Sequence, residues 1–268
     1  MVRKFFVLSI LLIMLFIMTV PAQAISYGTF DGTDHPNVGS MVAKVGDNYY
    51  QWCSGTLISD RVFLTASHCT APIDDFLAEN PGAEMLVTFD PTIHAGGTFY
   101  TGVWHTNPAY FTAHGSDDPG DVAVIVLDQA PGIAPASLPT EGLLDQLKSQ
   151  HILNDTLFTA VGYGTVRETN HKAWQSILDN VDRNRAVQSF LSLTDAWITF
   201  SMNLATGNGG TCYGDSGGPH FLHQGEVETS TVVAVTVTGD ANCKATDKDY
   251  RVDTPQARAF LSEFVELP

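Results

Sequence analysis

The apolar residues of this chain fall mostly into short runs bounded by Gly, Pro, Asn or Asp. Several of these runs alternate apolar and polar residues, which is typical of half-buried β-strands. We expect strands at residues 39–45, 61–66, 84–89, 121–128, 156–164, 196–202 and 229–239. The pattern predicts an all-β fold.

Helical periodicity is clear only near the C-terminus, where Thr254 can cap a helix and Pro255 suits its first turn. Apolar residues then recur on one face at Ala257, Phe260, Leu261 and Phe264. A stretch rich in proline and glycine, residues 130–142, could join two halves of the chain. We therefore expect two barrels or sandwiches and a docked terminal helix.

The first 24 residues have the pattern of a secretory signal peptide. Arg3 and Lys4 precede an apolar run from Phe5 to Val20, and small residues follow up to Ala24. The run is shorter than the roughly 20 residues that a membrane-spanning helix needs, although an uncleaved anchor is the alternative. We expect the mature protein to be secreted and extracellular, without stable membrane association.

The charge balance narrows the choice of partners. Twenty-nine acidic residues face 13 basic ones, for a net charge of −16, and removal of residues 1–24 takes it to about −18. Binding of nucleic acid or anionic membranes requires basic patches. The composition therefore argues against both of these partners.

Four cysteines in an exported chain predict two disulfides, for which three pairings are possible. Local pairing of Cys53 with Cys69 and of Cys212 with Cys243 is the simplest choice. Zinc binding is the competing use of cysteine, but the sequence has no C-x-x-C pair.

Candidate chemistry centres on CYGDSGGP, residues 212–219, where Asp215 and Ser216 lie among glycines. The simple interpretation is a polar surface turn. The alternative is a loop that presents Ser216 as a nucleophile, which requires a histidine base and an orienting carboxylate. His68 in FLTASHC is the best candidate base. Asp121, at the start of a predicted buried strand, is one candidate carboxylate, and Asp117 and Asp118 are others.

Four segments together resemble the trypsin- and chymotrypsin-like serine proteases. They are CSGTLISDRVFLTASHC (53–69), DVAVIVLD (121–128), AVGYG (160–164) and CYGDSGGP (212–219). The first and last segments are highly specific, and all four occur in the order of the family. The resemblance extends over nearly all of the chain after residue 24.

The resemblance implies two antiparallel Greek-key β-barrels, over residues 25–130 and 131–268, with the C-terminal helix in the second. It implies that Ser216 is the nucleophile, His68 the general base and Asp121 the residue that orients His68. The backbone N–H groups of Gly214 and Ser216 would form the oxyanion hole. The implied activity is hydrolysis of peptide bonds through an acyl-enzyme. A non-proteolytic esterase and a non-catalytic binding protein on the same fold are the alternatives.

The resemblance also implies disulfides Cys53–Cys69 and Cys212–Cys243, in agreement with local pairing. It gives Asp215 a role as the buried partner of a new N-terminal ammonium. Cleavage after Ala24 would make Ile25 that terminus, so signal removal itself would activate the protein. The alternative is that Asp215 pairs locally and Ile25 only begins a strand.

In the family, the specificity pocket has its floor six residues before the nucleophile, which here is Gly210. The resemblance places Thr211, Tyr213, Val237 and Gly239 around the pocket, with Val237 where the family usually has serine. Since Gly210 carries no charge, cleavage after basic residues is not supported, and an uncharged side chain of medium or large size is favoured. Asp247 or Asp249 are alternative residues that could reach the pocket.

The remaining candidate ligands do not indicate a metal site. His220 and His223 form H-x-x-H without the glutamate of a zinc protease, so we interpret them as strand or surface residues. His94, His105 and His114 lie among turn residues. DGTD, residues 31–34, lacks the ordered ligand pattern of a calcium loop. The proposed chemistry requires no cofactor or metal.

Overall fold

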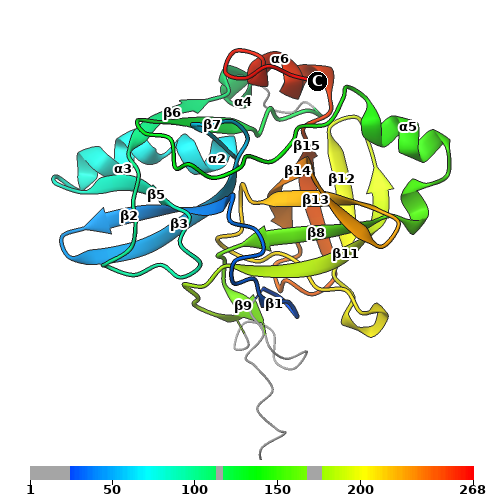
Figure 1. Ribbon diagram of the computed structural model, residues 1–268, viewed down its shortest axis with the longest axis horizontal. Coiled ribbons are helices and arrows are strands. Elements are labelled where there is room, and N and C mark those ends of the chain that lie inside the picture. Colours follow the sequence, from blue (N-terminus) through cyan, green and yellow to red (C-terminus); the bar gives the residue numbers. More distant parts are fainter. Residues whose placement is uncertain (1–24, 113–116, 168–176) are drawn as a thin grey trace, which may run out of the picture.

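A computed structural model of the chain describes residues 25–112, 117–167 and 177–268. Two β-sheets lie side by side, with short helices around them (Figure 1). The predicted all-β architecture is confirmed. The predicted signal peptide and His114 lie outside the described residues. Within the described ranges, no helix is both long and apolar enough to span a bilayer.

The first sheet has six antiparallel strands. In spatial order they are β5 (Glu84–Thr88), β2 (Val38–Val45), β3 (Asn48–Leu57), β4 (Val62–Thr65), β7 (Ala123–Leu127) and β6 (Gly102–Thr106). A bridge between Val87 and Tyr100 connects its two edges. Gly55 allows the close approach of β4, because a Cβ there would lie 2.4 Å from the Leu64 carbonyl oxygen.

The second sheet has seven strands, six of which form a closed barrel. The order is β1 (Thr29–Phe30), β11 (Asn184–Leu193), β12 (Trp197–Ser201), β15 (Thr246–Arg251), β14 (Val227–Gly239), β13 (Pro219–Gln224) and β8 (Leu157–Gly162). Closure comes from pairing of β11 with β8 as well as with β12. A separate two-stranded sheet joins β9 (Val166–Arg167) to β10 (Ile177–Leu178).

The C-terminal helix, α6 (Pro255–Leu261), begins as predicted. The Thr254 side chain accepts a hydrogen bond from the Ala257 N–H at 3.2 Å, and Pro255 occupies the first turn. The helix ends before Phe264, whose ring packs on Phe260 with centroids 5.2 Å apart. The other helices are α2 (Ser67–Thr70), α3 (Ile73–Glu79), α4 (Pro108–Thr112), α5 (Leu143–Ser149), η1 (Leu153–Asp155) and η3 (Leu204–Thr206).

All seven predicted strands are present as β2, β4, β5, β7, β8, β12 and β14. The pattern did not predict β3, β6, β11, β13 and β15, or helices α3 and α5. All of these strands except β6 carry polar residues at buried positions, as in Asp247 and Asp249 of β15. Alternation of apolar residues cannot identify a strand whose inward positions are carboxylates.

One apolar cluster joins the two sheets and α6. It includes Val38 and Val124 from the first sheet, Val235 and Tyr250 from the second, and Phe260 from the helix. This shared core fixes the first sheet against the second. The loops at the ends of β4, β7 and β14 and before β13 therefore have defined positions relative to one another.

Candidate active site

His68 and Asp121 are in direct contact. His68 lies in α2, immediately after β4, and Asp121 precedes β7, which pairs with β4. One Asp121 oxygen accepts the backbone N–H of His68 at 2.9 Å, and the other lies 2.9 Å from His68 Nδ1. Asp121 is buried, whereas the His68 side chain remains 28% exposed. The carboxylate thus fixes both the backbone and the ring, leaving Nε2 as the ring nitrogen not engaged with Asp121.

Ser67 strengthens the connection between these two segments. Its hydroxyl lies 2.8 Å from the Val122 carbonyl oxygen and 3.3 Å from that of Gly120, on both sides of Asp121. The backbone N–H of Asn107 donates to the same hydroxyl at 3.2 Å. The sequence alone did not reveal this role of Ser67, because its position next to His68 gives no indication of its contacts with residues far along the chain.

The disulfide Cys53–Cys69 connects the histidine to the nucleophile loop. Both predicted disulfides, Cys53–Cys69 and Cys212–Cys243, are formed. The Cys69 sulfur lies 3.7 Å from the Ser216 carbonyl oxygen, and a His68 ring nitrogen lies within 4.8 Å of the sulfurs. Within the described ranges, Ser216 Oγ makes no hydrogen bond to His68. Because both sulfurs are in the disulfide, this group does not provide thiolate ligands for a metal.

The nucleophile loop is held against β3 by Ser54 and Gln51. The Ser54 N–H donates to the Ser216 carbonyl oxygen at 2.8 Å, and the Gln51 side chain donates to the Gly214 carbonyl oxygen at 2.7 Å. Gly214 has a φ of 94°, and a Cβ there would lie 2.3 Å from the Gln51 side-chain oxygen. Glycine is therefore required at 214 for both conformation and space.

The backbone N–H groups of Gly214 and Ser216 make no hydrogen bond within the described part of the chain. Ser216 is only partly buried, and so is Gly214. An unpaired N–H costs little where solvent or a ligand can reach it. These two donors are therefore available to an incoming oxygen atom.

Asp215 points away from Ser216 into the protein interior, where it is fully buried. Its two oxygens accept the N–H groups of Gly164 at 2.7 Å and Cys212 at 2.9 Å. Burial raises the pKa of Asp215 to about 7, and these two hydrogen bonds oppose the shift only partly. Within the described residues, no cation pairs with this carboxyl group.

Ile25 is fully buried, and its neighbour Ser26 forms a β-bridge with Gly210. The Gly210 N–H donates to the Ser26 carbonyl oxygen at 2.9 Å. The first described residues thus run beside the segment that leads into the nucleophile loop. Among the described residues, Ile25 and Asp215 form no hydrogen bond or ion pair with each other, so their ion pair stays a prediction for the cleaved chain.

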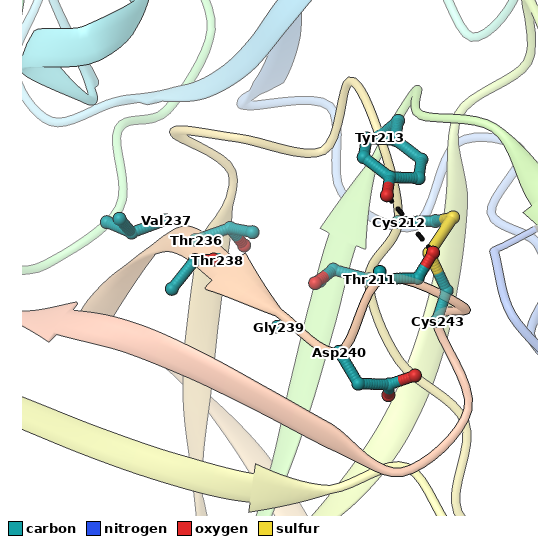
Figure 2. A pocket seen from close by; sticks show the side chains of 10 residues that line it. Thr211, Cys212, Tyr213, Thr236, Val237, Thr238, Gly239, Asp240 and Cys243 are labelled. Carbon is teal, nitrogen blue, oxygen red and sulfur yellow. Dashed lines mark hydrogen bonds between the residues drawn. A yellow bond between two sulfur atoms is a disulfide. The ribbon is translucent and has the colours of Figure 1, made fainter.

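A cavity of about 310 Å³ lies beside the nucleophile loop (Figure 2). It is lined by Thr211, Cys212, Tyr213, Thr236, Val237, Thr238, Gly239, Asp240, Ala241 and Cys243. The wall includes Thr211, Tyr213, Val237 and Gly239, the residues that the family resemblance assigns to the substrate pocket, and that assignment stays a prediction. Gly210 is not at the wall, since a Cβ there would lie 2.4 Å from Gln188 Nε2 and 2.5 Å from Met202 Cγ.

The two histidines of H-x-x-H have different positions in β13. His220 is fully buried beside Asp247 and Asp249, and His223 lies 2.8 Å from the Thr159 hydroxyl. In DGTD, Asp31 is buried against the Arg183 guanidinium at 2.8 Å. Asp31 is thus the carboxylate of a buried ion pair.

Residues 30–260 match the family described as Trypsin. Chymotrypsin-like elastase family member 1 of Bos taurus is 29% identical over 206 residues, covering 71% of this chain and 70% of the relative. The protein of the same name from Macaca fascicularis is 28% identical over 214 residues, covering 74% and 73%.

A solved structure titled HL collagenase has the same fold, with a TM-score of 0.62 and 17% identity. The match covers 90% of this chain and 99% of that one. The family match extends over most of the chain, including both sheets and the segments that contain His68, Asp121 and Ser216. The protein therefore belongs to the trypsin family of serine proteases.

Proposed function

We propose that this protein is a secreted serine endopeptidase that hydrolyses peptide bonds through a Ser216–His68–Asp121 triad and an acyl-enzyme. The observation that supports it most is the double contact of Asp121 with His68, beside the loop that carries Ser216. Contact of a buried carboxylate with Nδ1 favours the tautomer whose free Nε2 can accept a proton.

The proposed reaction has two steps. Ser216 Oγ attacks the carbonyl carbon of the scissile bond while His68 removes the hydroxyl proton. The C–N bond breaks, and His68 returns the proton to the departing amine. Water, activated by His68, then hydrolyses the ester on Ser216 and restores the free hydroxyl.

The negative charge on the attacked oxygen would be stabilised by the N–H groups of Gly214 and Ser216. Support comes from their freedom from other hydrogen bonds and from the fixed backbone of the loop. One such donor typically contributes about 3 to 4 kcal/mol to stabilisation of the transition state.

The proposal includes activation by cleavage before Ile25. In the uncut chain Ile25 has a φ of 63°, which is strained for a β-branched residue. This torsion involves the carbonyl carbon of residue 24, so cutting that peptide bond releases the strain. The new ammonium would then provide the charged partner that buried Asp215 lacks.

To test the triad, we would compare the processed protein with Ser216→Ala in peptide hydrolysis. Loss of the nucleophile should lower kcat/KM by about 10⁴ or more. A peptidyl phosphonate should label the wild-type protein at Ser216 and leave Ser216→Ala unlabelled. Ser230→Ala, which changes an exposed serine of β14, is the matched control and should keep full turnover.

The same assay separates the alternative functions. Phosphonate labelling with turnover of esters and no peptide cleavage would indicate an esterase. Absence of labelling in correctly processed, folded protein would instead support a non-catalytic binding protein.

Activation is tested by adding one residue before Ile25. The extra residue moves the ammonium away from Asp215, which should disorder the nucleophile loop and strongly reduce turnover. Undiminished turnover of this extended protein would contradict activation by signal removal and leave the triad unaffected.

A further inference from the structure

The cavity beside Ser216 has walls from two segments. One wall is Thr211–Tyr213, and the other is Thr236–Gly239 of β14 together with Asp240, Ala241 and Cys243 of the loop that follows (Figure 2). The Tyr213 hydroxyl donates to the Ala241 carbonyl oxygen at 3.0 Å. The Gly217 N–H donates to the Thr236 carbonyl oxygen at 2.7 Å, which connects the second wall to the nucleophile loop. A substrate side chain beside the scissile bond would therefore enter this cavity.

The cavity wall has one ionisable carboxylate and no lysine, arginine or histidine. Burial alone would raise the pKa of this residue, Asp240. The N–H groups of Ala245, Lys244, Thr246 and Asn242 outweigh burial and hold the pKa below its ordinary value. Asp240 is thus an anion at the cavity.

A second carboxylate lies behind the wall. Asp247 of β15 is fully buried, and its oxygens accept the Thr211 hydroxyl at 2.6 Å and the Gln188 amide at 2.7 Å. Lys248, the next residue, lies over the Trp197 ring, 4.3 Å from its centroid. The neighbouring lysine therefore does not neutralise Asp247.

The groups around Asp247 leave a net negative charge. Burial, followed by the neighbouring Asp249, raises the pKa of Asp247 to about 7. Burial also raises the pKa of Asp249 well above its ordinary value. His220 does not neutralise the pair, since burial lowers its pKa to about 4.

Thr211 is the residue through which Asp247 acts on the cavity. Its single hydroxyl hydrogen is donated to Asp247, so the oxygen presents only lone pairs to any other group. Hydrogen bonding to a carboxylate strengthens the acceptor character of such an oxygen. The cavity wall therefore favours a donor and disfavours an acceptor or an anion.

We propose that Asp247, acting through Thr211, makes this cavity selective for substrate side chains that end in a hydrogen-bond donor, above all the lysine ammonium. This inference rests on the proposed peptidase function. It differs from the uncharged side chain expected from the sequence, because the charge comes from β15 and not from position 210. Asp247 is a specificity-determining residue that does not touch the reacting atoms.

The test uses four peptides that differ only in the residue before the scissile bond: Lys, Gln, Met or Glu. These side chains are similar in length, so kcat/KM should follow donor character, with Lys highest, Gln and Met lower, and Glu lowest. A value for Met equal to or above that for Lys would overturn the proposal. Labelling of Ser216 by a phosphonate that carries methionine shows whether the peptidase chemistry itself is intact.

Two variants test whether Asp247 and Thr211 cause the preference for lysine. Asp247→Asn and Thr211→Val should each lower the Lys/Met ratio of kcat/KM by about tenfold or more. The reason is that the attraction between two opposite charges is weakly screened in a poorly solvated site. Glu84→Gln removes a distant surface charge and should keep the wild-type ratio. An unchanged ratio in Asp247→Asn would contradict the proposed role.

Two further measurements use the wild-type protein and remain informative if a variant fails to fold. The Lys/Met ratio should rise between pH 5.5 and 8 as the Asp247–Asp249 pair ionises. Butylammonium should slow phosphonate labelling of Ser216 at lower concentrations than n-butanol does. Equal protection by the two compounds, or a ratio independent of pH, would contradict a buried anion behind the cavity.

Discussion

Two buried histidines of this protein have nearly the same set of neighbours. His35 stacks on Phe221 with ring centroids 5.1 Å apart, and His220 stacks on Phe200 at 4.6 Å. Each histidine also lies beside two carboxylates. For His35 these are Asp31 and Glu228, and for His220 they are Asp247 and Asp249.

Their protonation differs because the contact geometry differs. The His35 nitrogens lie 2.5 Å from Asp31 and 2.6 Å from Glu228, and these hydrogen bonds outweigh burial and raise the pKa of His35 to about 9. Burial dominates at His220, whose Nε2 is 3.4 and 4.0 Å from the two carboxylates, and lowers the pKa to about 4.

The charged residues around the two histidines differ as well: those around His35 balance one another, and those around His220 do not. Arg183 adds a second cation to the Asp31 cluster, so this group of charges is balanced. No lysine or arginine pairs with Asp247 or Asp249 in the described ranges. The balanced cluster holds the N-terminal segment to the second sheet. The unbalanced cluster lies behind the substrate cavity, where an uncompensated charge can act on a ligand.

The largest effect is expected from His35→Phe, which keeps an aromatic ring on Phe221 but removes the imidazolium. Two partly or fully buried carboxylates then lose a cation, which should lower the free energy of unfolding at pH 7 by about 3 to 5 kcal/mol. Urea denaturation measures this loss. The contribution is fully present below pH 6.5 and disappears as pH rises through 9, so a loss that persists at pH 10 would contradict the assignment.

The second prediction concerns pH. Since the pKa of Asp247 is raised to about 7, the folded state binds an extra proton between about pH 4 and 7. Stability therefore falls as pH rises through this interval, by about 1.4 kcal/mol per pH unit at most for each such proton. In the uncut chain, Asp215 contributes in the same direction. Urea titrations at pH 4.5 to 7 should show a smaller fall for Asp247→Asn than for the wild type, and equal slopes would argue against a raised pKa.

His220→Phe should have a smaller effect than the same substitution at position 35. The lost group is a neutral ring whose hydrogen-bond contact is with the Thr236 hydroxyl at 3.1 Å, so the expected cost is about 1 kcal/mol. The cost should not vary between pH 5 and 8, because His220 stays uncharged there. A cost as large as that of His35→Phe would mean that His220 carries a charge.

The smallest effect is expected at a surface pair. Lys44 Nζ lies 2.6 Å from Glu84, the same separation as His35 Nε2 from Glu228, but both side chains are partly exposed to solvent. Lys44→Gln should leave the urea midpoint unchanged within error. A clear shift would show that distance alone, without burial, determines the strength of such pairs in this protein.

The sequence predicted those features whose signals are local. Seven strands, the cap of α6 by Thr254 and the local disulfide pairing could be read from short segments. The contact of His68 with Asp121 was predicted through the family resemblance, since Asp117 and Asp118 were equal candidates by pattern alone. In the structure, Asp118 accepts the Tyr250 hydroxyl at 2.7 Å.

The features that the sequence did not predict depend on contacts between residues far apart in the chain. The Asp247 cluster combines residues from β11, β13 and β15 with Thr211, and nothing in any one segment indicates that its carboxylates face inward. Likewise, Ser67 gave no signal for its contacts around Asp121. Strand register decides these contacts, and register is a property of the whole sheet.

The contact of His35 with Glu228 joins residues 193 positions apart, and Arg183 lies 152 positions after Asp31. Among the strands of the described residues, β1 likewise pairs only with β11. During synthesis, Asp31 and His35 therefore emerge long before Arg183 and Glu228, and these long-range contacts form only when most of the chain is available. Closing such long loops is entropically costly and slows folding. We expect the N-terminal segment to be among the last parts of the protein to dock.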